Sequence, residues 1–338
     1  MSGARYRLIG GNGSPYSCKL RAILRYRRLP HDWVLRTPGI AERDLGGLKV
    51  RLLPVLQRTD TGEYMLDSTP TALALEQLHP RTRSIVPPDP VHALLSFLIE
   101  DMADEWLAKA THLLHWELPE DQDHAARWTV SDTRPDLSGA ALDSAAEALK
   151  GRVVTRMALI GCVPQNAPII KETLGRVMRA LEPHVGYGRF LFGSRPALAD
   201  FGLYGQFHIM MTGFTPGDTV RRAAPMLGHW VRRLDDASGI EGAWLDPDEP
   251  LPEAVHALLR IAGEAYLPFL AANMRALETN RDRAALDIFG QPYVQQPFAY
   301  QEKCLRALRA AYATLNDAAQ ERADAILGPT GCLPFLVG

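Results

Sequence analysis

The chain has 338 residues, 46% of them hydrophobic and 22% charged, with a formal net charge of −2. This composition is typical of a globular protein with a sizeable buried core, and the nearly balanced charge argues against a nucleic acid or an anionic membrane as partner. Its four cysteines are widely scattered and lack metal-ligand spacing, and no segment approaches the ~18 apolar residues of a membrane span, so we expect a cytoplasmic protein with neither a disulfide framework nor a metal.

The first eighty residues predict a small mixed sheet flanked by helices. Short apolar runs bounded by glycine or proline indicate strands, and apolar residues three or four apart indicate helices. The predicted strands are residues 6–10, 31–36, 54–57 and 63–66, and the predicted helices are residues 16–28, 40–48 and 68–78. The last two strands flank "RTDTG", which predicts a hairpin. The order βαβ(α)ββα places a βαβ unit before a ββα unit.

Residues 79–90 contain four prolines and therefore predict a linker. Helical spacing dominates the rest of the chain, with a short helix and loops expected at 118–139 and a hairpin or loop between two long helices near the end. The expected helices are residues 91–116, 142–160, 167–181, 199–211, 220–234, 253–278 and 300–326. We therefore divide the chain into a mixed α/β domain (1–80), a linker (81–90), an all-α domain (91–240) and a helical C-terminal extension (241–338).

Ser14 lies at a junction where a predicted strand and a glycine-rich turn precede a helix. The N-terminus of a helix has unpaired N–H groups and the positive end of the helix dipole, so it suits an anion such as a thiolate. A hydroxyl there can donate a hydrogen bond to that anion and lower the pKa of its thiol. The alternative is a plain N-cap, with Pro15 at the first helical position.

Two further junctions carry polar or special residues. Pro54 precedes a strand, which indicates a strand start or a cis peptide bond at a tight turn. Asp67 and Ser68 lie between a strand and a helix, where N–H groups suit a carboxylate and Asp67 suits an ammonium. Together these groups fit an amino-acid-like zwitterion, although each alone is also typical of an N-cap.

Four segments, "SPYSCKLRAILRY", "LLPVL", "DSTPTALALEQL" and "FLFGSRPALADFGLYGQF", resemble the glutathione transferase superfamily in order and spacing. The resemblance covers roughly residues 5 to 235 and is to a serine-type, bacterial-like member with a long C-terminal extension. It implies a thioredoxin-like N-terminal domain that binds glutathione and an all-α domain that covers the second substrate. It also implies a homodimer and a role in detoxification.

Carried over to this chain, the resemblance makes Ser14 the residue that activates the glutathione thiol. The backbone of Leu53, before a cis-Pro54, pairs with the cysteinyl part of glutathione. Asp67 and Ser68 hold its γ-glutamyl end, although the family usually has Glu where Asp67 stands. Serines at both ends of the thioredoxin-like C-x-x-C position, Ser14 and Ser17, argue against disulfide exchange.

Two departures from the family pattern affect other positions. Leu52 stands where many members have Lys or Gln near the glycine carboxylate of glutathione, so Lys49 or Arg51 is the alternative partner. Ala197 replaces the hydroxyl residue of a capping box whose acid, Asp200, remains, which removes one capping bond at a cost of about 1 kcal/mol.

The resulting prediction is a glutathione transferase that presents the glutathione thiolate to an electrophilic, apolar small molecule. Glutathione is a co-substrate, and no metal is expected. A non-catalytic binding or scaffold protein and a glutathione-dependent isomerase or lyase are the alternatives. Within the first stretch, Tyr16, Ser17 and Cys18 are secondary candidates, with Cys18 expected to be a bystander. Histidines and acids at 112–124 fit an amphipathic helix and an acidic loop better than a metal site.

Overall fold

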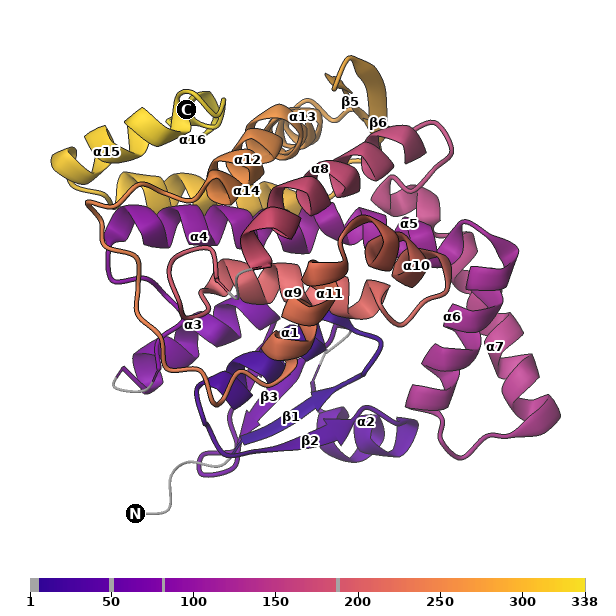
Figure 1. The fold of residues 1–338 in the computed structure, drawn as a ribbon. Coiled ribbons are helices and arrows are strands. Elements are labelled where there is room, and N and C mark those ends of the chain that lie inside the picture. Colours follow the sequence, from indigo (N-terminus) through magenta and orange to yellow (C-terminus); the bar gives the residue numbers. More distant parts are fainter. Residues whose placement is uncertain (1–5, 49–51, 81–82, 187–188, 338) are drawn as a thin grey trace.

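A computed structural model describes residues 6–48, 52–80, 83–186 and 189–337, and Figure 1 shows its arrangement. Its N-terminal part contains a four-stranded sheet of order β2-β1-β3-β4. β1 runs parallel to β2 and antiparallel to β3, and β3 is antiparallel to β4. The strands are β1 (Tyr6–Gly10), β2 (His31–Leu35), β3 (Val55–Arg58) and β4 (Tyr64–Leu66).

Helices cover both faces of this sheet because successive strand side chains point to opposite faces. Leu8 and Leu56 share a core with α1 (Pro15–Tyr26) and α3 (Ser68–Leu78). Ile9 and Val55, one residue away, pack with Leu45 of α2 (Pro38–Leu45) on the other face. The element order βαβαββα is the predicted thioredoxin-like arrangement, which is thereby confirmed.

The rest of the chain is almost entirely helical, as predicted. The elements up to residue 235 are α4 (Pro90–Met102), the π-helical turn η1 (Ala103–Leu107), α5 (Ala108–Trp116), α6 (Pro119–Thr133), α7 (Gly139–Val154), the 3₁₀ turn η2 (Met157–Ile160), α8 (Ala167–Val185), α9 (Leu198–Met210), α10 (Thr215–Ala223) and α11 (Pro225–Asp235). The later elements are α12 (Glu253–Ile261), the π-helical turn η3 (Ala262–Tyr266), α13 (Leu267–Glu278), β5 (Ala284–Ile288), β6 (Gln291–Gln295), α14 (Ala299–Ala313), α15 (Asp317–Leu327) and α16 (Leu333–Leu336).

Several segments differ from their predicted form, and three of them show the physical reasons. The stretch expected to be a short helix with loops contains the 15-residue α6, which begins at a favourable proline and has two acids in its first turn. The helix predicted at 220–234 is divided into α10 and α11, because Pro225 cannot continue the hydrogen bonding of α10. The helix predicted at 300–326 ends at Ala313 and resumes after Asn316, which caps α15.

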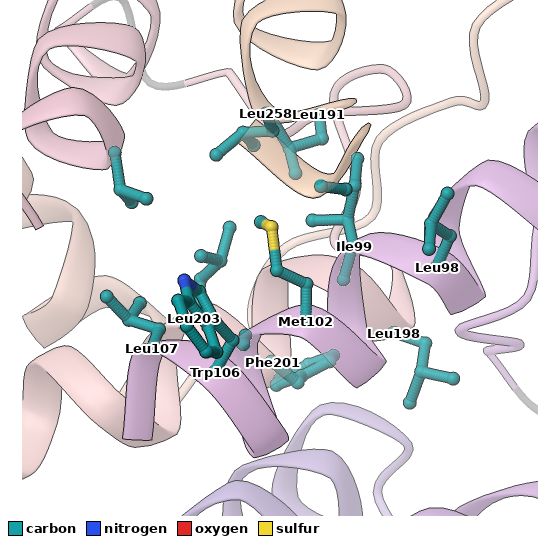
Figure 2. Close-up of a cluster of buried hydrophobic side chains, with 14 of the residues drawn as sticks. Leu98, Ile99, Met102, Trp106, Leu107, Leu191, Leu198, Phe201, Leu203 and Leu258 are labelled. Carbon is teal, nitrogen blue, oxygen red and sulfur yellow. The ribbon is translucent and has the colours of Figure 1, made fainter. Parts of the chain in front are cut away.

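The largest hydrophobic core contains residues of the sheet-containing part, of the helices that follow it and of the C-terminal extension. Figure 2 shows Met102 and Trp106 from α4 and η1 beside Phe201 of α9 and Leu258 of α12. α9 is buried along almost its whole length, which explains its apolar character on every face. It also packs closely on α1, since a β-carbon at Gly205 would lie only 2.7 Å from the Pro15 carbonyl oxygen. This contact fixes the first turn of α1.

The residues after 241 lie against α4 and α8 (Figure 1). α12 packs on α8, whereas α14 and α15 pack on α4. Arg322 of α15 forms a two-pronged ion pair with Asp89, at 2.8 and 3.2 Å, and Asp89 also caps α4. This extension therefore shares its core and its polar contacts with the preceding helices.

The structure shows how the start of α9 is capped although Ala197 provides no hydroxyl group. Asp200 Oδ2 accepts a hydrogen bond from the Ala197 backbone N–H at 2.8 Å, and Oδ1 accepts one from Leu191 N–H at 3.0 Å. Burial raises the pKa of Asp200 to about 7. The acid half of the box is therefore kept where the hydroxyl half is absent. In the described ranges, none of the helices has the length and apolar character needed to cross a membrane.

Candidate functional site

The register of the sheet brings the predicted site segments to one end of it. Ile9 pairs with Val55, and Val55 pairs in turn with Leu66. The turn after β1, the Leu53–Pro54 bond before β3 and Asp67 after β4 therefore leave the sheet at a common end. Helices α1 and α3 begin at this same end. Two helix N-termini and a backbone segment are thus close neighbours.

Ser14 is the N-cap residue of α1. Its backbone is extended, and its Oγ accepts a hydrogen bond from Ser17 N–H at 3.3 Å, while Pro15 occupies the first turn. The cap uses the hydroxyl only as an acceptor. Among the residues that the structure describes, the Ser14 hydroxyl has no acceptor of its own, and Ser14 is partly exposed. Capping and donation to a ligand are therefore compatible roles for Ser14.

The peptide bond between Leu53 and Pro54 is cis. Pro54 is buried, and Leu53 is partly exposed beside the turn that leads to Ser14. A β-carbon at Gly11 would lie 3.7 Å from Leu53 Cδ1. Leu52 is 69% exposed and offers no charge to a carboxylate. The alternative partners for that carboxylate, Lys49 and Arg51, lie outside the described residues.

Asp67 and Ser68 begin α3, as the sequence predicts for this junction. Asp67 has a backbone φ of 71° and ψ of 137°, and its side chain makes no capping bond. Instead, Asp67 Oδ2 accepts a hydrogen bond of 2.6 Å from the hydroxyl of Tyr300, in the C-terminal extension. Ser68 is 2% exposed and opens the helix. The N–H groups of this first turn lack intrahelical partners.

The side chains of the secondary candidates are held by contacts with residues other than Ser14. Ser17 is buried, and its side chain lies next to Gly10, which also contacts the Trp33 ring. Cys18 is fully buried with its Sγ against the Asn12 carbonyl at 3.5 Å, and burial raises the pKa of its thiol to about 12. The Tyr16 hydroxyl donates to the Asp104 carbonyl at 3.0 Å, and burial raises its pKa well above the usual range.

Helix α6 forms a wall beside the Ser14 turn. Asp132 accepts hydrogen bonds from the backbone N–H of Asn12 at 2.7 Å and from its side-chain amide at 2.6 Å. Trp128 is close enough that a β-carbon at Gly13 would lie 3.0 Å from its ring. These contacts fix the conformation of the turn that presents Ser14. They join residues about 120 positions apart, and local sequence patterns carry no signal for them.

A group of charged residues lies inside the boundary between α1, α3 and α4. Lys19 forms ion pairs with Glu100 and with Asp104, the latter at 2.6 Å, and its side chain is fully buried. Lys19 also donates to Thr69 Oγ1 at 3.0 Å. Burial opposes the charge of Lys19, but the carboxylates of Asp104 and Glu100 outweigh it and raise its pKa. Lys19 therefore ties the first helix to α4 and to the start of α3.

Further carboxyl groups extend this charged region through η1. Asp101 accepts a 2.6 Å hydrogen bond from Tyr266, and burial raises the pKa of Asp101 to about 7. Burial, and then the charges of Asp101 and Asp104, raise the pKa of Glu105 well above its usual range. Glu105 is partly exposed and has no hydrogen-bond or ion-pair partner among the residues with described positions. Burial thus favours the protonated form of both carboxyl groups.

Sequence reasoning did not identify this acidic group, because the apolar spacing of residues 91–116 predicts only an uninterrupted helix. The sequence does contain a signal for this group, because four carboxyl residues interrupt a hydrophobic stretch: Glu100, Asp101, Asp104 and Glu105. The π-helical turn η1 that carries two of them is a conformation often found at functional sites. Within the described ranges, no group of three or more His, Cys, Asp or Glu side chains is arranged to hold a metal ion.

Comparison with known proteins agrees with this arrangement. Residues 8–83 match the family described as "Glutathione S-transferase, N-terminal domain". Residues 8–83 therefore resemble that N-terminal domain, and the match covers less than a quarter of the 338-residue chain. A search of curated proteins returned no match.

Similar solved structures include the beta-etherase LigF from Sphingobium sp. strain SYK-6, at 19% identity, with a TM-score of 0.49 and coverage of 68% of this chain and 94% of that one. A glutathione S-transferase from Methylobacterium radiotolerans, solved with glutathione sulfonate, is 21% identical with a TM-score of 0.44 and coverage of 73% and 100%. The transferase GSTFuA3 from Phanerochaete chrysosporium is 17% identical, with a TM-score of 0.47 and coverage of 69% and 96%.

Proposed function

We propose that this protein is a glutathione transferase that uses glutathione as co-substrate and presents its thiolate to an electrophilic, apolar small molecule. The observation that carries the proposal is the common end of the sheet, where Ser14, the cis Leu53–Pro54 bond and Asp67 meet. A peptide lying there would reach two helix N-termini at once. The match of residues 8–83 to a glutathione S-transferase N-terminal domain supports glutathione as that peptide.

Each residue has a separate role in this proposal. The Ser14 hydroxyl donates to the sulfur anion while its oxygen continues to cap α1. The backbone of Leu53 pairs with the cysteinyl residue of glutathione. Asp67 accepts the γ-glutamyl ammonium, and the N–H groups that begin α3 at Ser68 take the neighbouring carboxylate. The protein thus supplies positioning and charge stabilisation, and glutathione supplies the nucleophile.

The second substrate would enter beside the turn that α6 borders. Trp128 offers it an apolar surface, and the turn carrying Ser14 lies next to that ring. The Glu105 carboxyl in η1, whose pKa is raised by burial and by neighbouring carboxylates, is the candidate proton donor for a leaving group. The homodimer stays a prediction from the family resemblance, and the cytoplasmic location stays a prediction from the sequence composition.

The test combines calorimetric titration with glutathione and a turnover assay against a panel of apolar electrophiles. We expect saturable one-site binding, and turnover that Ser14→Ala lowers about a hundredfold, by analogy with the loss of a donor to a developing anion. Ser144→Ala, at an exposed position in α7, is the matched control and should leave turnover unchanged. A wild-type chain that does not bind glutathione would refute the proposal, whereas binding without turnover, or with isomerisation or lysis instead of conjugation, would support one of the alternatives.

A further inference from the structure

The C-terminal extension reaches the predicted glutathione site through one side chain. The Tyr300 hydroxyl donates to Asp67 Oδ2 at 2.6 Å, across 233 positions of sequence. Burial, and then the hydrogen bond to Asp67, raise the pKa of Tyr300. The hydroxyl therefore stays protonated and acts as a donor at neutral pH. The contact is a charge-assisted hydrogen bond, the stronger kind.

A second contact fixes the position of Tyr300. Asn273 of α13 is fully buried, and its amide forms two hydrogen bonds with the backbone of Phe298, at 2.8 and 3.0 Å. Phe298 is the residue before α14, and Tyr300 stands in the first turn of that helix. The start of α14 is thereby held against α13, so Tyr300 is presented from a rigid support.

Asp67 itself has an unusual backbone. Its φ of 71° with ψ of 137° is a conformation that costs a residue with a β-carbon about 1–3 kcal/mol. At an N-cap, Asp ordinarily turns its side chain to the N–H groups of its own helix. Here the carboxylate makes no such bond and lies against Tyr300 instead. The Asp67 carboxylate is therefore not used to cap α3, and Asp67 remains partly exposed.

The Tyr300 hydroxyl occupies only one of the two carboxylate oxygens. Oδ1 of Asp67 has no hydrogen-bond partner among the residues that the structure describes, and Asp67 is partly exposed. Glu105 of η1 interacts electrostatically with Asp67. Lys19, a cation that contacts the start of α3, is already paired with Glu100 and Asp104. An unpaired carboxylate oxygen suits an ammonium group.

We propose that Tyr300 is a positioning residue of the glutathione site, which holds Asp67 so that its free oxygen accepts the γ-glutamyl ammonium. This inference rests on the proposed function. It makes the extension a part of the binding site, in addition to its packing on α4. The expected consequence is that loss of the Tyr300 hydroxyl weakens recognition of the ammonium and leaves recognition of the rest of glutathione unchanged.

The experiment compares two ligands on the full chain by calorimetry. Glutathione carries the ammonium, whereas glutaryl-cysteinylglycine lacks it and keeps the other groups. In Tyr300→Phe we expect the affinity for glutathione to fall about tenfold, the size of one charge-assisted hydrogen bond, with no change for the analogue. Tyr312→Phe is the matched control, since the Tyr312 hydroxyl donates to Asp324 at 2.6 Å within the extension. It should leave both affinities unchanged.

Two further variants separate positioning from folding. In an Asp67→Asn background, Tyr300→Phe should have no additional effect on glutathione affinity, because both changes act on the same contact. Tyr300→Gln keeps an N–H donor and should recover part of the affinity. If the melting temperature shows that Tyr300→Phe does not fold, Tyr300→Gln takes its place in the comparison of the two ligands.

The outcomes distinguish this inference from the proposed function. If the wild-type chain binds glutathione and Tyr300→Phe binds it equally well, the role of Tyr300 is refuted and the proposed function stands. Equal weakening of both ligands would mean a structural role only, and tighter glutathione binding would mean that the hydroxyl competes with the ammonium. Each of these results overturns the inference. A wild-type chain that binds no glutathione refutes both proposals.

Discussion

The ammonium group of Lys19 lies 2.6 Å from a carboxylate oxygen of Asp104, inside the boundary between α1 and η1. Glu100 is the second partner of Lys19, and both acids belong to the segment of α4 and η1 that the sheet-containing part packs against. One buried cation thus faces two buried carboxylates. Such a group is sensitive to the loss of any member, because the remaining charges stay buried without compensation.

Replacing Lys19 by Met should therefore destabilise the protein. The variant keeps the aliphatic volume but leaves Glu100 and Asp104 without their cation, so we expect the free energy of unfolding to fall by about 3–5 kcal/mol at pH 7. Urea denaturation measures this loss. Lys150→Met is the matched control, since Lys150 pairs with Asp123 and Glu147 at the surface and should change stability by less than about 1 kcal/mol. If Lys19→Met and Lys150→Met lower the free energy of unfolding equally, Lys19 does not form a buried charged group with Glu100 and Asp104.

The stability of the protein should depend on the ionisation of Asp101. Burial raises the pKa of Asp101 to about 7 in the folded state, whereas an unfolded Asp has a value near 3.9. Between these values the unfolded state binds fewer protons, so the contribution of Asp101 to stability is complete below about pH 4 and is lost as the pH rises through about 7.

Asp101→Asn should remove this pH dependence. The amide oxygen still accepts the hydrogen bond from Tyr266 but cannot ionise. We expect the free energy of unfolding of the variant, relative to wild type, to increase by a few kcal/mol, about 2–4, from pH 4 to pH 8. Asp282→Asn, at an exposed position, controls for the loss of one negative charge. If the difference in the free energy of unfolding between Asp101→Asn and wild type stays constant with pH, the pKa of Asp101 is not raised in the folded state.

The four cysteines should be unreactive in the folded protein. All of them are buried, and burial raises the pKa of Cys18, Cys162 and Cys332 to about 12 each. Little thiolate is then present at pH 8, and the thiolate is the form that attacks a disulfide reagent. Titration with an aromatic disulfide should modify less than about one thiol in minutes, and four after denaturation. Rapid modification that Cys18→Ser abolishes would return Cys18 to the list of candidate site residues.

The sequence predicts the local parts of the fold well, including the conformation of the segments that carry the candidate site residues. The strands of the first domain, the helix starting at Ser68 and the special role of Pro54 all depend on neighbouring residues, and Ser14 is at the helix start expected from its strand, glycine turn and proline. The same local information explains the hairpin formed by β3 (Val55–Arg58) and β4 (Tyr64–Leu66). These features need no knowledge of which helices pack together.

The remaining site features depend on contacts between distant segments. Tyr300 meets Asp67, and Asp132 meets Asn12, only because whole helices pack in a particular order, and helical periodicity does not specify which helix faces which. The apolar spacing of residues 91–116 likewise gives no signal for the π-helical turn η1 that follows α4. The partner for the glycine carboxylate of glutathione stays a prediction, because Lys49 and Arg51 lie outside the described residues.

The most direct test of the account is the pKa of the glutathione thiol bound to the protein, measured by the ultraviolet absorbance of the thiolate in a pH titration. A hydroxyl that donates to the sulfur anion stabilises the ionised form. The account predicts a bound thiol pKa well below the value of about 8.5 for a free cysteine, and an increase of about one unit or more in Ser14→Ala, with Ser144→Ala unchanged. Bound glutathione whose thiol pKa is the same in wild type and Ser14→Ala would contradict it.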